Sequence, residues 1–176
     1  MNGKNIGMAM GLIIGIIISL FVIKAFNKDG KMRTKYDEMQ ELVRGRAYKY
    51  AFWILLIYEA LLIIADCCNL DLRCSNYMLQ FIGIIIAVMV HAIYSIWNDA
   101  YIGLNTNPKR FAIISTFIAL LNLIIGIGSI TTVGLLENGM VRDSFANLLC
   151  GICFLVIAIV LFIKHKQDIA EESEEV

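Results

Sequence analysis

Long runs of hydrophobic residues, almost free of charge, alternate with short polar stretches along the chain. A helix needs about 20 apolar residues to cross the roughly 30 Å hydrocarbon core of a membrane. Five runs are about that long: Ile6–Phe26, Tyr48–Ala65, Met78–Trp97, Phe111–Ile130 and Asn147–Ile163. Apolar residues surround each segment on all sides, and a lone strand cannot satisfy its backbone groups in lipid. The pattern therefore predicts an all-α, polytopic membrane bundle of five transmembrane helices.

The composition agrees with a membrane protein. Of the 176 residues, 59% are hydrophobic and 17% are charged, and the mean hydropathy is +0.74. A soluble domain usually has about 45–50% apolar and about 25% charged residues. The composition excludes a soluble enzyme, a nucleic-acid-binding protein, a disordered chain and a secreted disulfide scaffold.

The distribution of lysine and arginine predicts how the chain is oriented. These residues gather after the first span, before the fourth and after the fifth, whereas the N-terminus and the other two loops carry one each. Because cytoplasmic loops are enriched in Lys and Arg, we expect the N-terminus outside and the C-terminus in the cytoplasm. More positive charge follows the first span than precedes it, which predicts a retained helix rather than a secretory signal.

The polar segments outside the spans have distinct patterns. Thr34 and Asp37 have the spacing of a capping box, which predicts a helix over about residues 35–47. Its modest apolar stripe predicts a helix on the inner membrane surface that runs into the second span; a docking helix for a cytoplasmic partner is the alternative. The membrane domain covers 1–166, and the acidic tail 167–176 is expected to be disordered.

Two of the polar segments resemble a known group of proteins. The first contains Tyr36-Asp37-Glu38-Met39-Gln40 followed by Arg44-Gly45, and the second runs from Ile96 to Asn105. Both are similar to segments of small bacterial multispan inner-membrane proteins of unknown function. Members of that group often have arginine where this chain has Met39. The resemblance implies the bacterial cytoplasmic membrane and supplies no catalytic residue.

Small residues recur along the first span. Gly7, Gly11, Gly15 and Ser19 follow at intervals of four residues and therefore share one helix face. Such a face lets another helix approach closely. We expect it to pack within the monomer or in a homodimer, with a docking face for another membrane subunit as the alternative.

Three polar residues lie within the predicted spans. Glu59 is costly to place in lipid and should be paired, protonated or turned toward the bundle. At 1.5 Å per residue, Glu59 and Asn122 both lie roughly 16 Å from the inner ends of their spans, and His91 lies about 9 Å from its own. We expect the Asn122 amide to pair with Glu59. A network that fixes helix register and a proton or cation relay both remain open.

The five cysteines map to the predicted outer side. Cys67, Cys68 and Cys74 lie in the loop between the second and third spans, and Cys150 and Cys153 share one face of the fifth. The arrangement resembles the vitamin K epoxide reductase family, which implies electron transfer from a loop pair to a quinone beside Cys150 and Cys153. One structural disulfide with buried thiols is the other interpretation. No metal site is expected, because no histidine lies on that side.

These patterns favour a small, non-enzymatic membrane protein: an accessory, immunity or transport-complex component. Its expected partners are the lipid bilayer and, through the first helix, another membrane subunit or a second copy of the chain. We expect no cofactor and no nucleic acid. The alternatives are a thiol–quinone oxidoreductase using the cysteines and a small proton-coupled transporter using Glu59.

Overall fold

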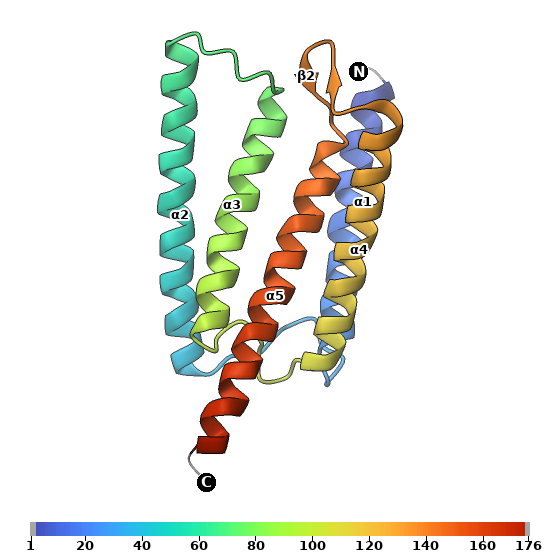
Figure 1. Cartoon of the computed structure of the whole chain (residues 1–176). Coiled ribbons are helices and arrows are strands. Elements are labelled where there is room, and N and C mark those ends of the chain that lie inside the picture. Colours follow the sequence, from blue (N-terminus) through green and yellow to red (C-terminus); the bar gives the residue numbers. More distant parts are fainter. Residues whose placement is uncertain (1–2, 175–176) are drawn as a thin grey trace.

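The computed structural model describes the backbone of residues 3–174, and the side-chain surroundings of residue 10 and residues 13–170. Helices form all five hydrophobic segments, as predicted, and a two-stranded antiparallel hairpin precedes the last of them (Figure 1). The elements are α1 (Gly3–Phe26), α2 (Glu38–Cys67), α3 (Asn76–Trp97), α4 (Pro108–Val133), β1 (Leu136–Glu137), β2 (Met140–Val141) and α5 (Phe145–Glu174).

Successive helices run in alternating directions, so the connections gather at two ends (Figure 1). The loops 27–37 and 98–107 lie at one end with the last turns of α5, and we call this the basic end. The loop 68–75 and the β-hairpin lie at the other, the hairpin end. A hydrogen bond from the Val141 N–H to the Arg73 carbonyl (2.8 Å) joins the two connections at the hairpin end.

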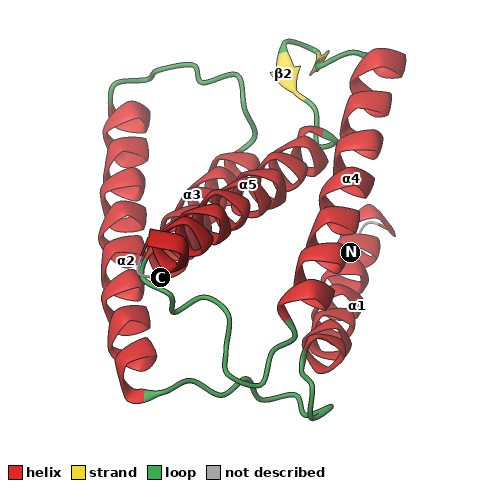
Figure 2. Cartoon of the chain, turned by 60° about the horizontal axis from the view of Figure 1, so that its bottom comes forward, coloured by secondary structure: helices red, strands yellow, loops and turns green. Residues whose placement is uncertain are grey.

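The helices form an open row rather than a closed bundle. Their main contacts run in the order α2, α3, α5, α4, α1, and Figure 2 shows α2 and α4 on opposite sides of α3 and α5. Four helices, α2 to α5, are long and apolar enough to cross a membrane, which fits a multi-pass membrane protein. In α1 the described residues supply a shorter apolar helix, Ile13–Phe26, so the fifth span stays a prediction.

The buried core lies where α3 crosses α5. Ala92 and Ile96 of α3 pack there with Cys153 and Ile157 of α5, and each of the four is at most 3% exposed. Most other large apolar side chains are exposed on the helix surfaces. In a soluble protein such extensive apolar exposure would favour association, but a bilayer covers it with acyl chains.

Glycines allow the closest helix contacts. A Cβ atom added at Gly126 of α4 would lie 2.8 Å from the backbone nitrogen of Leu148 in α5. A Cβ added at Gly151 of α5 would lie 2.9 Å from the backbone nitrogen of Leu123 in α4. Gly83 of α3 similarly accommodates the ring of Tyr58. Glycines thus bring the backbones of α4 and α5 together, and on α3 a glycine makes room for a ring of α2.

The structure corrects the expected start of the second helical segment. Asp37, not Thr34, is the N-cap: its side chain accepts a hydrogen bond from the Gln40 N–H, and the Gln40 side-chain oxygen accepts one from the Asp37 N–H. The helix therefore begins at Glu38 instead of Lys35. It continues unbroken to Cys67, so residues 38–47 run into the second span, as expected, and form the first turns of α2.

The end of the chain also differs from expectation. The acidic tail 167–176 was predicted to be disordered, but α5 continues as helix to Glu174. An ion pair between Lys164 and Asp168 (2.8 Å) lies across this transition and supports the added turns. Glu175 and Val176 lie outside the described residues.

Candidate functional site

The two loops at the basic end are joined by backbone hydrogen bonds, forming what we call the loop junction (residues 27–37 and 98–107). The Lys28 N–H donates to the Asn105 carbonyl (2.7 Å) and the Asn107 N–H to the Phe26 carbonyl (2.9 Å). The Leu104 N–H donates to the Lys35 carbonyl (2.9 Å). These contacts link positions 69 to 81 residues apart in the sequence and attach the α1–α2 connection to the α3–α4 connection.

Asn105 holds the centre of the loop junction. Its amide nitrogen donates to the Asp29 carboxylate (3.2 Å) and to the Arg33 carbonyl (3.0 Å), and its Oδ1 accepts from the Lys35 N–H (2.8 Å). A hydrogen bond from the Lys31 N–H lowers the pKa of the Asp29 carboxyl, and the Asn105 amide adds to this effect. Both ends of one amide side chain are therefore used to connect the loops.

A buried polar pair lies next to Asn105. The Thr106 hydroxyl donates to Asn27 Oδ1 (3.0 Å), and the Asn27 amide donates to the Lys31 carbonyl (2.8 Å). Asn27 is 2% exposed and Thr106 is 7% exposed. Gly103 completes the close fit, because a Cβ there would lie 2.7 Å from the Lys35 carbonyl oxygen. Polar groups removed from water require such partners.

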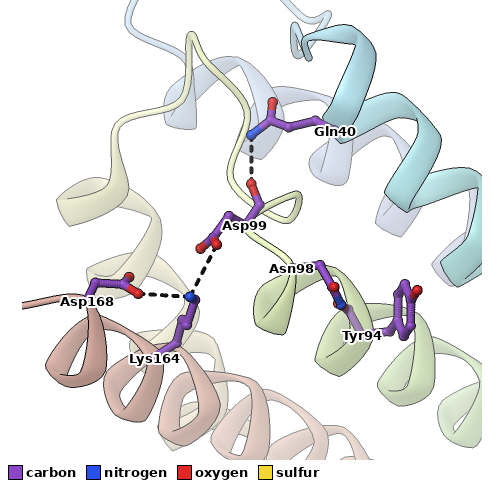
Figure 3. A network of polar contacts seen from close by, with 6 residues as sticks. All are labelled: Gln40, Tyr94, Asn98, Asp99, Lys164 and Asp168. Carbon is purple, nitrogen blue, oxygen red and sulfur yellow. Dashed lines mark hydrogen bonds and ion pairs between the residues drawn. The ribbon is translucent and has the colours of Figure 1, made fainter. Parts of the chain in front are cut away.

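Gln40 couples the start of α2 to the end of α3. Its side-chain oxygen accepts from the Asp37 N–H, and its amide nitrogen donates to the Asp99 carbonyl (2.8 Å, Figure 3). The same nitrogen also donates to the Ile102 carbonyl (3.3 Å). The segments 35–50 and 96–105, on which the expected resemblance to the bacterial group rests, therefore contact each other. Gln40 and Asn105 are structural members of these segments, and Met39 is 71% exposed beside them.

An ion-pair chain connects the loop junction to α5. Lys164 Nζ lies 3.2 Å from the Asp99 carboxylate and 2.8 Å from that of Asp168 (Figure 3). Lys164 is largely covered, with a side chain 20% exposed, whereas the Asp99 side chain is 68% exposed. The last turns of α5 are thus held against the turn that follows α3.

Aromatic rings connect the ends of α1 and α4 to the loop that follows α3. The Phe111 ring of α4 lies 4.9 Å from the Phe26 ring of α1 and 5.5 Å from the Tyr101 ring, measured between centroids. Burial raises the pKa of Tyr101 to about 12, so its phenol stays protonated at any physiological pH. The ring contributes apolar area rather than acid–base chemistry.

A second cluster surrounds Arg44 of α2. Its guanidinium lies 4.0 Å from the centre of the Tyr36 ring, and one nitrogen donates to the Tyr48 hydroxyl (3.3 Å). Burial raises the pKa of Tyr36, and the charge of Arg44 opposes this rise. The Tyr48 ring packs on His91 of α3 with centroids 4.2 Å apart. Within the described part of the chain, the buried His91 Nε2 atom has no hydrogen-bond partner.

The structure does not bring the predicted intramembrane polar residues together. Asn122 donates to the Ile118 carbonyl of its own helix (2.9 Å), and α4 is separated from the α2 helix of Glu59 by α3 and α5 (Figure 2). His91 packs on Tyr48, which is 11 residues and about 16 Å along α2 from Glu59. The expected Glu59–Asn122 pair is therefore wrong, because neighbouring depth does not make two helices neighbours.

The small-residue face of α1 has no close partner where the chain is described. A Cβ added at Gly15 would meet nothing within 4 Å, and Ser19 is exposed and bonds back to the Ile16 carbonyl (2.7 Å). Gly7 and Gly11 belong to α1, but their surroundings lie outside the described residues. At Gly15 and Ser19, the expected packing within the monomer is not found.

All five cysteines are free thiols. Cys67 and Cys68 are exposed at the end of α2, Cys74 is half-buried, and Cys153 is 3% exposed in the α3–α5 core. Burial raises the pKa of the Cys74 thiol. Cys153 thus packs as an apolar side chain, away from the surface where a quinone in the bilayer would reach it.

Two further observations bear on the chemistry. Searching the described residues finds no group of three or more His, Cys, Asp or Glu side chains that could hold a metal ion. Comparisons with protein-family models, curated proteins and solved structures gave no match. The loop junction was missed at the sequence level; the only hint was the expected resemblance of 35–50 and 96–105, two segments that overlap its two halves.

Proposed function

We propose that this chain is a non-enzymatic, accessory component of a membrane assembly, which it joins through α1. The observation that carries the proposal is the open space beside Gly15, on the face that the small residues of α1 share. We place the protein in the bacterial cytoplasmic membrane, with the basic end toward the cytoplasm, because Lys and Arg concentrate in the loops of that end.

The use of glycine elsewhere in the chain supports this interpretation. Gly126 and Gly151 each lie against the backbone of a neighbouring helix, as glycines on helix faces do in membranes. Gly15 is surrounded by apolar residues of the same helix but faces no other helix of the chain. A helix from a second copy or another subunit would give this face the close contact that the monomer lacks.

The weak attachment of α1 fits a role in assembly. Helix α1 packs chiefly on α4, at the end of the open row, and the Phe26–Phe111 contact holds its last turn. Ile14 and Ile18, which flank Gly15 and Ser19 on that side of α1, are each about half exposed. The face is therefore available to a partner without unpacking the core. Neither electron transfer nor proton transport has a comparable observation in its favour.

Replacing Gly15 with isoleucine tests the proposal. Because no atom lies within 4 Å of the added Cβ, the monomer should keep its thermal stability, while assembly through this face should be lost. We would compare cross-linked species in native membranes and the particle mass in mild detergent for the wild type and Gly15→Ile.

Ile17→Leu, on the opposite side of α1, is the matched control and should leave the assembly intact. A wild type that runs as a monomer in both measurements, or an assembly that survives Gly15→Ile, would contradict the proposal. A loss of monomer stability in Gly15→Ile would instead show that the face packs within the chain.

A further inference from the structure

A groove of about 720 Å³ lies at the basic end between α4 and α5. Its walls are apolar side chains of both helices, including Phe111, Ala112, Ile159 and Phe162. Tyr101 of the loop junction also lines it. Ile159 is 48% exposed and Phe162 is 60% exposed, so the walls continue onto the surface of the helices that the bilayer covers.

One end of the groove is charged. Lys109, Lys164, His165, Asp99 and Asp168 line it, and both carboxylates are engaged by Lys164 (Figure 3). Lys109 is exposed at the first turn of α4 and forms no ion pair with any residue whose surroundings are described. The groove therefore has an apolar length and, at its end, a cation that is free to bind.

The charges beside the groove favour an anion. Lys166 lies 5.1 Å from the centre of the Phe162 ring, so a further cation stands next to the wall. With His165 neutral, Lys109, Lys164 and Lys166 give three positive charges against two from Asp99 and Asp168. An amphiphile with an apolar chain and an anionic head matches this pattern along its whole length. A soluble anion would leave the apolar walls unused.

We propose that the groove binds an anionic phospholipid of the surrounding membrane. One acyl chain lies against Phe111, Ile159 and Phe162, and the phosphate lies beside Lys109 and His165. Basic pockets between transmembrane helices are a recurring way to hold acidic lipid headgroups. The bound lipid would fill the space between the ends of α4 and α5, next to the Asp99–Lys164–Asp168 chain that holds α5 against the turn after α3.

Native mass spectrometry of the full chain, released from a neutral detergent, measures directly which lipid stays bound to the protein. The probes are dioleoyl phosphatidylglycerol and dioleoyl phosphatidylcholine at equal concentration. We expect the wild type to retain one phosphatidylglycerol more strongly than phosphatidylcholine. Lys109→Gln should weaken that retention about fivefold, the equivalent of about 1 kcal/mol for one cation near an acidic lipid surface.

Two matched controls keep the result specific. Lys49→Gln removes an exposed cation of α2 that does not line the groove, and it should leave the affinity unchanged. Ala112→Trp fills the groove from an exposed position and should abolish the preference for phosphatidylglycerol. Ile113→Trp, its neighbour outside the groove, should retain the preference.

Several outcomes would overturn the inference. Equal retention of the two lipids by the wild type would show that the cations do not select an anionic headgroup. A preference for phosphatidylglycerol that persists in Ala112→Trp would show that the lipid binds to another surface. An equal loss in Lys49→Gln and Lys109→Gln would reduce the effect to the general charge of the basic end.

Discussion

Individual polar side chains connect segments of this chain that lie far apart in the sequence. Asp37 and Gln40 cap α2, and Gln40 also holds the Asp99–Ile102 turn. Asn105 satisfies groups on both loops, and the buried Asn27–Thr106 pair lies beside it. These residues act as connectors. Their hydrogen bonds position the helix ends and place no reactive group in a cleft.

The Thr106 hydroxyl should contribute measurably to stability. Thr106→Val keeps the shape of the side chain but leaves Asn27 Oδ1 without its donor in a buried site, which should lower the free energy of unfolding by about 1–3 kcal/mol. Thr131→Val is the control, because that exposed hydroxyl bonds only to Gly128 of its own helix and should change stability by less than about 0.5 kcal/mol.

Urea or thermal unfolding in mild detergent would compare the two variants. Adding Asn27→Ala to Thr106→Val should cost less than Asn27→Ala alone, because the shared bond is already lost. Equal effects of Thr106→Val and Thr131→Val would show that the pair does not stabilise the loop junction.

Among the helices, small residues determine which pairs approach closely. The α4–α5 contact depends on Gly126 and Gly151, each of which faces the backbone of the other helix. Gly128, two residues from Gly126 on the same helix, faces open space. A glycine in a span is therefore no evidence for packing until its neighbours are known.

This difference gives a prediction for α4. Gly126→Ile should push α5 away, since the new Cβ would lie 2.8 Å from Leu148 N, and overpacking of this kind typically costs about 1–3 kcal/mol. Gly128→Ile should be tolerated. Thermal stability in detergent checks both variants, and similar melting temperatures for the two would contradict the α4–α5 contact.

The arrangement of all five helices separates a connected end from a more open one. At the basic end the loop junction, the aromatic cluster and the Asp99–Lys164–Asp168 chain link every helix. At the hairpin end, the Val141–Arg73 hydrogen bond joins the β-hairpin to the loop 68–75. The exposed Cys67 and Cys68 lie where α2 ends and this loop begins.

The cysteines test the proposed orientation and the absence of disulfides together. A membrane-impermeant maleimide added to intact cells should label Cys67 and Cys68 without prior reduction. Cys74 should react more slowly, because burial raises its pKa and the thiolate is the reactive form. Cys153, in the α3–α5 core, should stay unlabelled.

Mass spectrometry of the labelled peptides, taken at successive times, shows which cysteines are labelled first. The variant Cys67→Ser with Cys68→Ser is the control for the exposed signal. Labelling only after permeabilisation would invert the orientation, and a sharp rise after adding a reductant would reveal a disulfide.

The hydrophobic pattern alone was enough to predict five helical segments, because each run is apolar on all sides and needs no partner to form a helix. Local signals also indicated the capping region near Asp37, although the box begins three residues later than expected. Which helices pack against one another could not be predicted from the sequence. Glu59 and Asn122 share a depth but lie on helices that do not meet, and His91 pairs with Tyr48 instead.

The tertiary structure decided which small and polar residues have partners. Gly126 and Gly15 are the same residue type in the same kind of segment, yet one faces a backbone and the other open space. In the same way, Asn105 and Asp29 are 76 residues apart and meet only because two loops return to one end of the molecule. Hydropathy depends on each residue by itself and can be read along the chain, whereas close contact depends on the positions of two helices or loops at once.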